Sequence, residues 1–253
     1  MLAAVLLTFL TAEAGTVKKV FEIDDFTGIS ATDNFEVTLV LGDTFRIEVE
    51  VTDEFLPYVV VKNNSGVLDL RFSKLPFKLR QKERKKVAKA VVQLPKLTYI
   101  SLSGASKLSS SDRFSNAMNK IELRIAGASS ISNLSVQAPD VDIQVSGASK
   151  ATLSVRGSDV RAEVSGASTL DVVGHAVDYR VNVSGSSRVK GEDFEVEEAD
   201  VTASGASSVD VLPMRALSVD LSGASKCRYH GESEDLHLKS MKVSGTSSIK
   251  QEK

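Results

Sequence analysis

Eight serines occupy equivalent positions of a repeated Ser-Gly-Ala-Ser motif, and serine is a residue type that enzymes use as a nucleophile. They are Ser106, Ser129, Ser149, Ser168, Ser187, Ser207, Ser225 and Ser247. A serine nucleophile requires one activated hydroxyl beside a base that a third group orients. Eight equivalent serines without a histidine in register do not meet that requirement. The pattern instead predicts a structural row of hydroxyls at stacked turns.

The three histidines, His175, His230 and His237, lie at unequal positions of the repeat. No pair of them has the close spacing of metal ligands on one element. We interpret each as a surface residue, and we expect neither a metal site nor a cofactor.

Four consecutive copies of the repeat carry an acidic residue seven positions before the glycine. These residues are Asp140, Asp159, Asp178 and Glu198. Stacked strands would place them about 4.8 Å apart, where like charges repel or recruit a cation. One interpretation is a stripe that binds Ca²⁺ or a basic partner. The interpretation we favour is a splayed row at a turn, relieved by the nearby Arg161 and Arg180.

Residues 78–86 form the one strongly biased charge run, Lys-Leu-Arg-Gln-Lys-Glu-Arg-Lys-Lys, bracketed by Pro76 and Pro95. Its candidate binding residues are Lys82, Arg84, Lys85 and Lys86. A functional interpretation is a patch for an anionic partner such as lipopolysaccharide, phospholipid head groups or acidic glycans. We favour a solvated hairpin tip that precedes a strand over residues 87–94.

The elements that carry these side chains follow from the spacing of the motif. The eight glycines are Gly104, Gly127, Gly147, Gly166, Gly185, Gly205, Gly223 and Gly245. Their separation of about twenty residues indicates one supersecondary unit that is repeated and stacked, because a single unit cannot bury its apolar face alone.

Apolar side chains lie two, four and six residues before the glycine, as Val145, Ile143 and Val141 do in one copy. Polar residues alternate with them, which is the period of a strand with one face in a core. The fourth residue after the glycine is apolar in every copy, and the third is polar, for example Lys150 or Arg188. Each coil is therefore predicted to contain a strand, a sharp corner at the glycine, a second short strand and a variable return.

Stacked coils of this kind form an all-β parallel β-helix of about eight coils, and we expect the right-handed form. Glycine reaches the positive φ of a sharp corner without the cost that other residues bear. The single cysteine, Cys227, takes the apolar fourth position of its copy, so it is predicted to be a small buried hydrophobe rather than a reactive thiol.

Three regions are predicted along the 253 residues. Residues 1–14 contain a short apolar run and Ala12-Glu13-Ala14, which indicate a cleaved secretory signal peptide; the alternative is a hydrophobic first strand. Residues 15–98 are β-rich without the repeat, and we expect them to cap the first coil. They include two alternating strands joined at Gly42-Asp43 and another pair around residues 63–66. Residues 99–253 form the β-helix.

Composition narrows the partners. The net charge is −2 with acids and bases interspersed, which gives no electrostatic case for nucleic acid. Tryptophan is absent and aromatic residues make up 6% of the chain, which weakens the case for a sugar-stacking cleft. We also expect no transmembrane segment in the mature chain, since the apolar run at the start is too short to span a bilayer.

Several segments, in order, resemble one known family. They are Phe26-Thr27-Gly28-Ile29, the strands around Gly42-Asp43, Leu94-Pro95-Lys96-Leu97, and the repeated Ser-Gly-Ala-Ser that starts at Ser103. Together they resemble the bacterial auto-transporter adhesin family with a head GIN domain, over about residues 20–249. The resemblance implies an exported protein with a β-helical head and an adhesive role, and it brings no catalytic residues.

We therefore expect a non-enzymatic protein of the periplasm, cell surface or extracellular space, which presents rows of polar side chains to a surface ligand such as a glycan, an envelope component or a protein. An alternative is a polysaccharide-active enzyme, because β-helices also host lyases and hydrolases. Such an enzyme needs clustered carboxylates or a metal on one face, which only the acidic stripe offers. A further alternative is an intracellular scaffold, for which the first residues would have to form an ordered strand.

Overall fold

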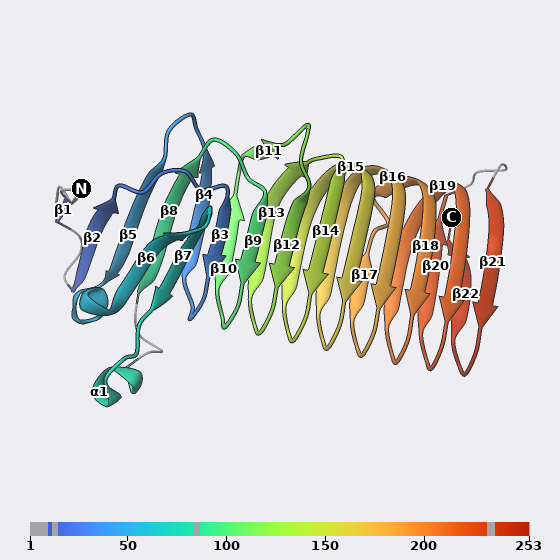
Figure 1. Cartoon of the computed structure of the whole chain (residues 1–253). Helices are drawn as coiled ribbons and strands as arrows, with labels where there is room; N and C mark the ends of the chain where they lie inside the picture. The colour runs from blue at the N-terminus through green and yellow to red at the C-terminus, as the bar shows by residue number, and fades with distance from the viewer. Residues whose placement is uncertain (1–9, 12–14, 83–86, 232–235, 253) are drawn as a thin grey trace.

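The chain folds into a β-solenoid of about eight turns, elongated along the stacking axis (Figure 1). The computed structural model describes residues 10–11, 15–82, 87–231 and 236–252. Most of the predicted signal peptide, residues 1–14, lies outside the described residues, as do Arg84, Lys85 and Lys86. Within the described part, no helix has the length and apolar character needed to cross a bilayer.

The solenoid consists almost entirely of short strands. In chain order the elements are β1 (Leu10–Thr11), β2 (Thr16–Phe21), β3 (Gly28–Ala31), β4 (Glu36–Leu41), β5 (Arg46–Thr52), the 3₁₀ helix η1 (Asp53–Tyr58), β6 (Val59–Asn64), β7 (Val67–Phe72), α1 (Phe77–Arg80), β8 (Ala88–Leu94), β9 (Tyr99–Leu102), β10 (Lys107–Ser110), β11 (Arg113–Ser115), β12 (Ile121–Ile125), β13 (Ser130–Gln137), β14 (Asp140–Val145), β15 (Lys150–Val164), β16 (Thr169–Val183), β17 (Arg188–Lys190), β18 (Phe194–Ala203), β19 (Ser208–Leu221), β20 (Lys226–His230), β21 (His237–Val243) and β22 (Ser248–Glu252).

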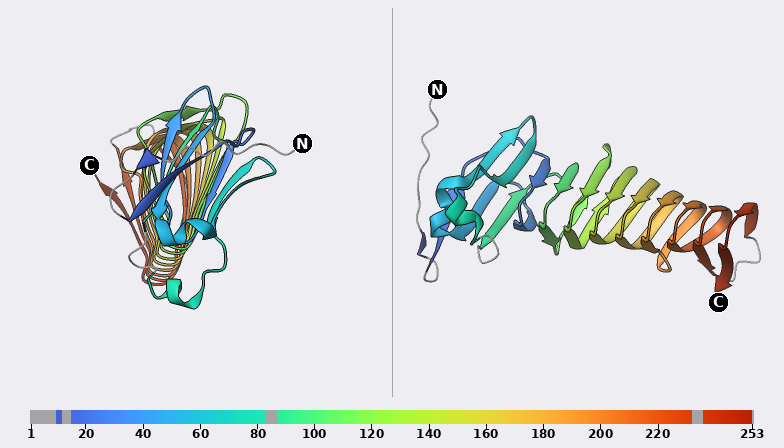
Figure 2. Two further views of the ribbon diagram at one scale, coloured as in Figure 1. Left: turned by 90° about the vertical axis from the view of Figure 1, so that its left-hand side faces the viewer. Right: turned by 90° about the horizontal axis from the view of Figure 1, so that it is seen from below.

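Two parallel sheets run along the axis. The pre-corner sheet contains the strands that lead into the glycine corner: β9, β12, β14, the second halves of β15, β16, β18 and β19, and β21. The post-corner sheet contains β10, β13, the first halves of β15, β16 and β19, and β17, β20 and β22. The corners form the row of tight loops along the lower edge of Figure 1. Seen end-on, the coils superpose (Figure 2).

Alternation of side chains fills the space between the two sheets, as the sequence period predicts. Val141, Ile143 and Val145 of β14 are at most 1% exposed, and the inward residues of the following coils continue the same columns. Because each inward residue packs on its equivalents in the coils above and below, the core is continuous along the axis.

The corner glycines have the conformation that the sequence predicts, with φ between 70° and 79° in all eight copies. At Gly166 a Cβ atom would lie 2.5 Å from the carbonyl oxygen of Gly147 in the preceding coil. That oxygen also accepts a hydrogen bond of 2.8 Å from the backbone N–H of Ala167. The corner therefore requires glycine both for its backbone conformation and for the close approach of stacked backbones.

One coil precedes the sequence repeat. Strands β3 and β4 pair in parallel with β9 and β10, so residues 28–41 stack as a coil beneath the first Ser-Gly-Ala-Ser unit. Asp33 occupies the corner at φ 71°, and its Oδ2 accepts a hydrogen bond of 2.9 Å from the N–H of Phe72. Aspartate is among the few residues that tolerate this conformation, which explains why the glycine signature is missing here.

The remaining N-terminal strands extend this end of the solenoid. β4 and β5, the two strands that flank Gly42-Asp43, do not pair with each other, because β8 lies between them and pairs with both. β5 in turn pairs antiparallel with β2, and β2 with β1. The second predicted strand pair is a true hairpin, since β6 and β7 are antiparallel neighbours.

Tyr179 is the largest fully buried side chain, and its hydroxyl has no hydrogen-bond partner among the described residues. Its ring packs edge-on against Phe194 with 5.1 Å between centroids. Burial raises the pKa of the phenol well above its usual value. We expect Tyr179→Phe to raise the free energy of unfolding by about 1–3 kcal/mol, because it removes a hydroxyl that gives up its hydrogen bonds to water on folding and gains none in return. Denaturant unfolding measures this, and a less stable variant would show that the hydroxyl has a bonding partner.

Candidate binding faces

The repeated serines lie inside the corners rather than on a reactive surface. Seven of the eight are buried, the exception being Ser247, which is partly exposed. Ser168 Oγ donates to the carbonyl oxygen of Gly147 at 3.3 Å and accepts from the N–H of Ser149 at 3.4 Å. The hydroxyls of Ser149, Ser168, Ser187, Ser225 and Ser247 each donate to the corner glycine of the preceding coil, whereas those of Ser106 and Ser207 donate within their own coil. Both arrangements are the structural role predicted from the sequence.

Replacement of Ser168 by alanine tests this role. We expect the free energy of unfolding to fall by about 1 kcal/mol, because two long hydrogen bonds between coils are lost. Ligand binding is expected to remain at the level of the wild-type protein. Parallel unfolding and binding measurements decide the question, and a loss of binding without a loss of stability would assign the serine a functional role.

The predicted acidic residues do stack in register on the pre-corner sheet. Asp140 pairs with Asp159, Asp159 with Asp178, and Asp178 with Glu198. No group of three or more histidine, cysteine, aspartate or glutamate side chains in the described part of the chain is arranged to hold a metal ion.

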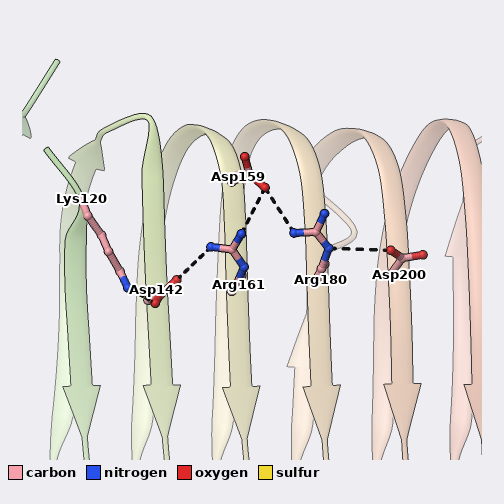
Figure 3. A network of polar contacts seen from close by, with 6 residues as sticks. All are labelled: Lys120, Asp142, Asp159, Arg161, Arg180 and Asp200. Carbon is pink, nitrogen blue, oxygen red and sulfur yellow. Dashed lines mark hydrogen bonds and ion pairs between the residues drawn. The ribbon is translucent and has the colours of Figure 1, made fainter. Parts of the chain in front are cut away.

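Basic side chains interleave with carboxylates on this sheet, of which Asp159 belongs to the acidic row (Figure 3). Asp159 Oδ1 lies 3.5 Å from Arg161 Nη2 and 3.3 Å from Arg180 Nη1. Arg161 also reaches Asp142, which pairs in addition with Lys120, and Arg180 Nε lies 3.9 Å from Asp200. The relief by Arg161 and Arg180 that the sequence predicts is thus present at Asp159.

Glu198 continues this neutralisation. It accepts hydrogen bonds from Lys239 Nζ at 2.6 Å and from Arg215 Nη2 at 2.9 Å. These two bonds hold the pKa of its carboxyl below the usual value, so the group remains ionised at any pH near neutrality. The pre-corner face therefore carries several charged side chains that pair with one another, among them Asp159, Arg180 and Glu198.

The described part of the basic run, residues 78–82, includes most of α1, a single short turn at the N-terminal end of the solenoid (Figure 1). Lys82 Nζ lies 2.8 Å from Glu54 Oε2. The other three candidate residues of the run, Arg84, Lys85 and Lys86, lie outside the described residues. Binding of an anionic partner by this run stays a prediction.

The post-corner face differs in its electrostatics. Lys150, Arg188 and Lys226 are exposed, and none forms an ion pair with another described residue. They occupy the same position, three residues after the corner glycine, in every second coil. This face therefore carries cations that are available to a partner.

A polar cluster that sequence reasoning missed lies at the C-terminal end of the same face. The Asp210 side chain is 5% exposed and accepts two hydrogen bonds from Arg228, one of them 2.7 Å to Oδ2. This contact raises the pKa of Arg228. His230 Nε2 lies 3.5 Å from Asp210 Oδ1, and with Glu192 and Glu252 the cluster lines a hollow of about 300 Å³. The sequence does contain a signal for this pair, because Asp210 and Arg228 each lie five residues after a corner glycine in successive coils.

Cys227 is buried beside this cluster, as its apolar repeat position predicts. Burial raises the pKa of its thiol to about 12, with a smaller contribution from the charge of Asp210. The thiolate is therefore negligible at neutral pH, which agrees with a packing role.

Comparison with known proteins identifies the family. The model of the family described as "Putative auto-transporter adhesin, head GIN domain" matches residues 25–233, and the chain belongs to this family. No curated protein matches the chain.

Solved structures share the fold at low sequence identity. A putative adhesin from Parabacteroides merdae has a TM-score of 0.82 at 18% identity, covering 95% of this chain and 98% of that chain. A putative adhesin from Parabacteroides distasonis has a TM-score of 0.81 at 14% identity, with coverage of 94% and 98%. A putative lipid binding protein from Parabacteroides distasonis has a TM-score of 0.73 at 15% identity, with coverage of 95% and 98%.

Proposed function

We propose that this chain is an exported, non-enzymatic protein of the cell envelope or cell surface that binds a surface partner through the outer faces of its solenoid. The observation that carries the proposal is the post-corner face, on which regularly spaced cations have no partner within the described chain. Family membership supports an adhesive role for such a face. Affinity would arise from many weak contacts spread along the axis.

The test is binding of purified protein, residues 15–253, to an array of glycans, envelope components and lipid vesicles. Vesicles belong in the array because one structural neighbour is described as a putative lipid binding protein. Three variants locate the binding surface. The first combines Lys150→Gln and Arg188→Gln on the post-corner face, and the second combines Asp159→Asn and Asp178→Asn on the pre-corner face. The third replaces four residues of the basic run by serine, namely Lys82, Arg84, Lys85 and Lys86.

Saturable binding that one variant abolishes would support the proposal and identify the face. Turnover of any arrayed glycan would overturn the non-enzymatic part of it. Absence of binding to every component would contradict the adhesive role. Export is tested separately: expression of the full chain is expected to yield a mature protein cleaved between Ala14 and Gly15, which mass spectrometry detects.

A further inference from the structure

One row of side chains crosses the whole outer surface of the post-corner sheet and its N-terminal extension. The strand register aligns, from the N-terminal end of the solenoid, Lys18, Glu50, Lys89, Glu36, Lys107, Ser130, Lys150, Thr169, Arg188, Ser208, Lys226 and Ser248. The first four residues of the row do not follow chain order, so the row becomes visible only through the strand pairing. All twelve side chains are exposed or half-buried.

The row alternates strictly. Every second position is lysine or arginine, and none of the intervening positions is basic. Because neighbouring strands lie about 4.8 Å apart, successive cations along the row lie roughly 10 Å apart. Cations that served solubility alone would not need to lie on every second strand. The regular spacing therefore points to a partner whose charges repeat at the same distance.

The residues between the cations divide the row into two parts. In the N-terminal part they are glutamates, and ion pairs join Lys18 to Glu50 at 3.9 Å and Lys107 to Glu36 at 2.9 Å. In the C-terminal part they are hydroxyl side chains, which leave the cations unpaired within the described chain. We call this part the basic row; it comprises Ser130, Lys150, Thr169, Arg188, Ser208, Lys226 and Ser248.

The surroundings leave the basic row open. On the corner side lie small exposed residues such as Gly147 and Ala148, which do not cover it. On the other side the neighbouring acids are Asp171, which lies opposite Lys190 in the register, and Asp210, which is buried against Arg228. An anionic chain laid along the axis would therefore meet cations without a competing exposed carboxylate beside each of them.

We infer that the basic row binds a linear acidic polysaccharide that carries one carboxylate per disaccharide, laid along the solenoid axis. In an extended glycan chain each sugar advances by nearly one strand spacing, so a charge on every second sugar meets the cation on every second strand. The hydroxyl side chains between the cations face the uncharged sugars and can exchange hydrogen bonds with them. This inference rests on the proposed function and specifies its ligand class.

The match favours this ligand over two other anions. A glycan with a carboxylate on every sugar would place half of its charges opposite hydroxyls rather than cations. An anionic bilayer presents its charges over a plane, so its binding would not require cations at a regular spacing along one line. Each exposed contact is weak and screened by salt, so affinity depends on several contacts at once and falls as ionic strength rises.

The experiment measures equilibrium binding of residues 15–253 to an oligosaccharide of alternating glucuronate and N-acetylglucosamine, ten or more sugars long. Polygalacturonate, an uncharged N-acetylglucosamine oligomer and phosphatidylglycerol vesicles are measured alongside. The test variant combines Lys150→Gln, Arg188→Gln and Lys226→Gln. The control variant removes the same charge elsewhere, at Lys62, Lys74 and Lys242, which are exposed and form no ion pair with a described residue. Thermal unfolding verifies that both variants are folded.

The expected result is a loss of affinity for the alternating oligosaccharide of about tenfold or more in the test variant, and of no more than about twofold in the control. Equal losses in both variants would overturn the inference in favour of unspecific charge attraction. Binding of vesicles but not of the oligosaccharide would assign the row to a membrane instead. If the oligosaccharide does not bind, but another component of the array binds equally well to the wild-type protein and the test variant, this inference is overturned while the proposed function stands. Absence of all binding would overturn both.

Discussion

Replacement of Gly166 by alanine is expected to lower the free energy of unfolding by about 2–5 kcal/mol. The left-handed backbone conformation costs an L-residue about 1–2 kcal/mol. The added methyl group would also lie 2.5 Å from the carbonyl oxygen of Gly147, so the two stacked backbones must separate, at a cost typical of overpacking of about 1–3 kcal/mol. Denaturant unfolding followed by circular dichroism measures the change.

Gly66 provides the matched control. It also has a positive φ, 85°, but a Cβ atom there would meet nothing within 4 Å. Gly66→Ala therefore carries only the conformational cost and is expected to lose about 1–2 kcal/mol. If both variants lost the same amount, close backbone stacking at the corner would not contribute to stability.

Replacement of Phe35 by alanine is expected to lower the free energy of unfolding by about 3–5 kcal/mol. Phe35 is fully buried in the coil that precedes the repeat, and its ring stacks on Phe72 with 5.1 Å between centroids. Phe72 in turn contacts Phe55 edge-on at 6.0 Å. Truncation would leave a cavity at the N-terminal end of the core, which the rigid strands around it cannot close.

Phe77 of α1 serves as the control, because it is 75% exposed and its replacement by alanine removes no core contact. We expect Phe77→Ala to change stability by less than about 0.5 kcal/mol. A Phe35→Ala variant as stable as the wild-type protein would show that the N-terminal aromatic cluster is not part of the cooperative unit.

The repeated coils could be predicted because their physical requirements recur in the sequence. Each corner needs a glycine at positive φ, and each strand needs alternating apolar residues. Stacking against an identical neighbour imposes both requirements on every copy. The coil of residues 28–41 escaped this logic, because Asp33 replaces the glycine and Phe35 takes the place of the repeated serine. On the side of this coil that faces away from the repeats, strand β7 ends at Phe72, and the N–H of Phe72 donates a hydrogen bond to the Asp33 side chain. A side-chain contact thus takes the place of the close backbone contact that requires glycine at the other corners.

The candidate sites were predictable to a smaller degree. The acidic row and its arginine partners follow from repeat alignment, because equal repeat positions become neighbours in the stack. The full alternating row does not, since Lys18 and Lys89 reach it through pairings between strands that share no repeat. Burial of Asp210 likewise depends on how the Arg228 side chain covers it, which alignment alone does not reveal.

The two-strand spacing of the cations is tested most directly by the affinity of the Lys150→Thr, Thr169→Lys double variant for the alternating acidic oligosaccharide. The exchange preserves composition, net charge and the face that carries the charge, but it moves one cation by a single strand and breaks the two-strand spacing. We predict an affinity about tenfold below that of the wild-type protein, because fewer contacts can form at once. An affinity equal to that of the wild-type protein would contradict the inference, because binding would then depend on the charge of the face and not on the spacing of its cations.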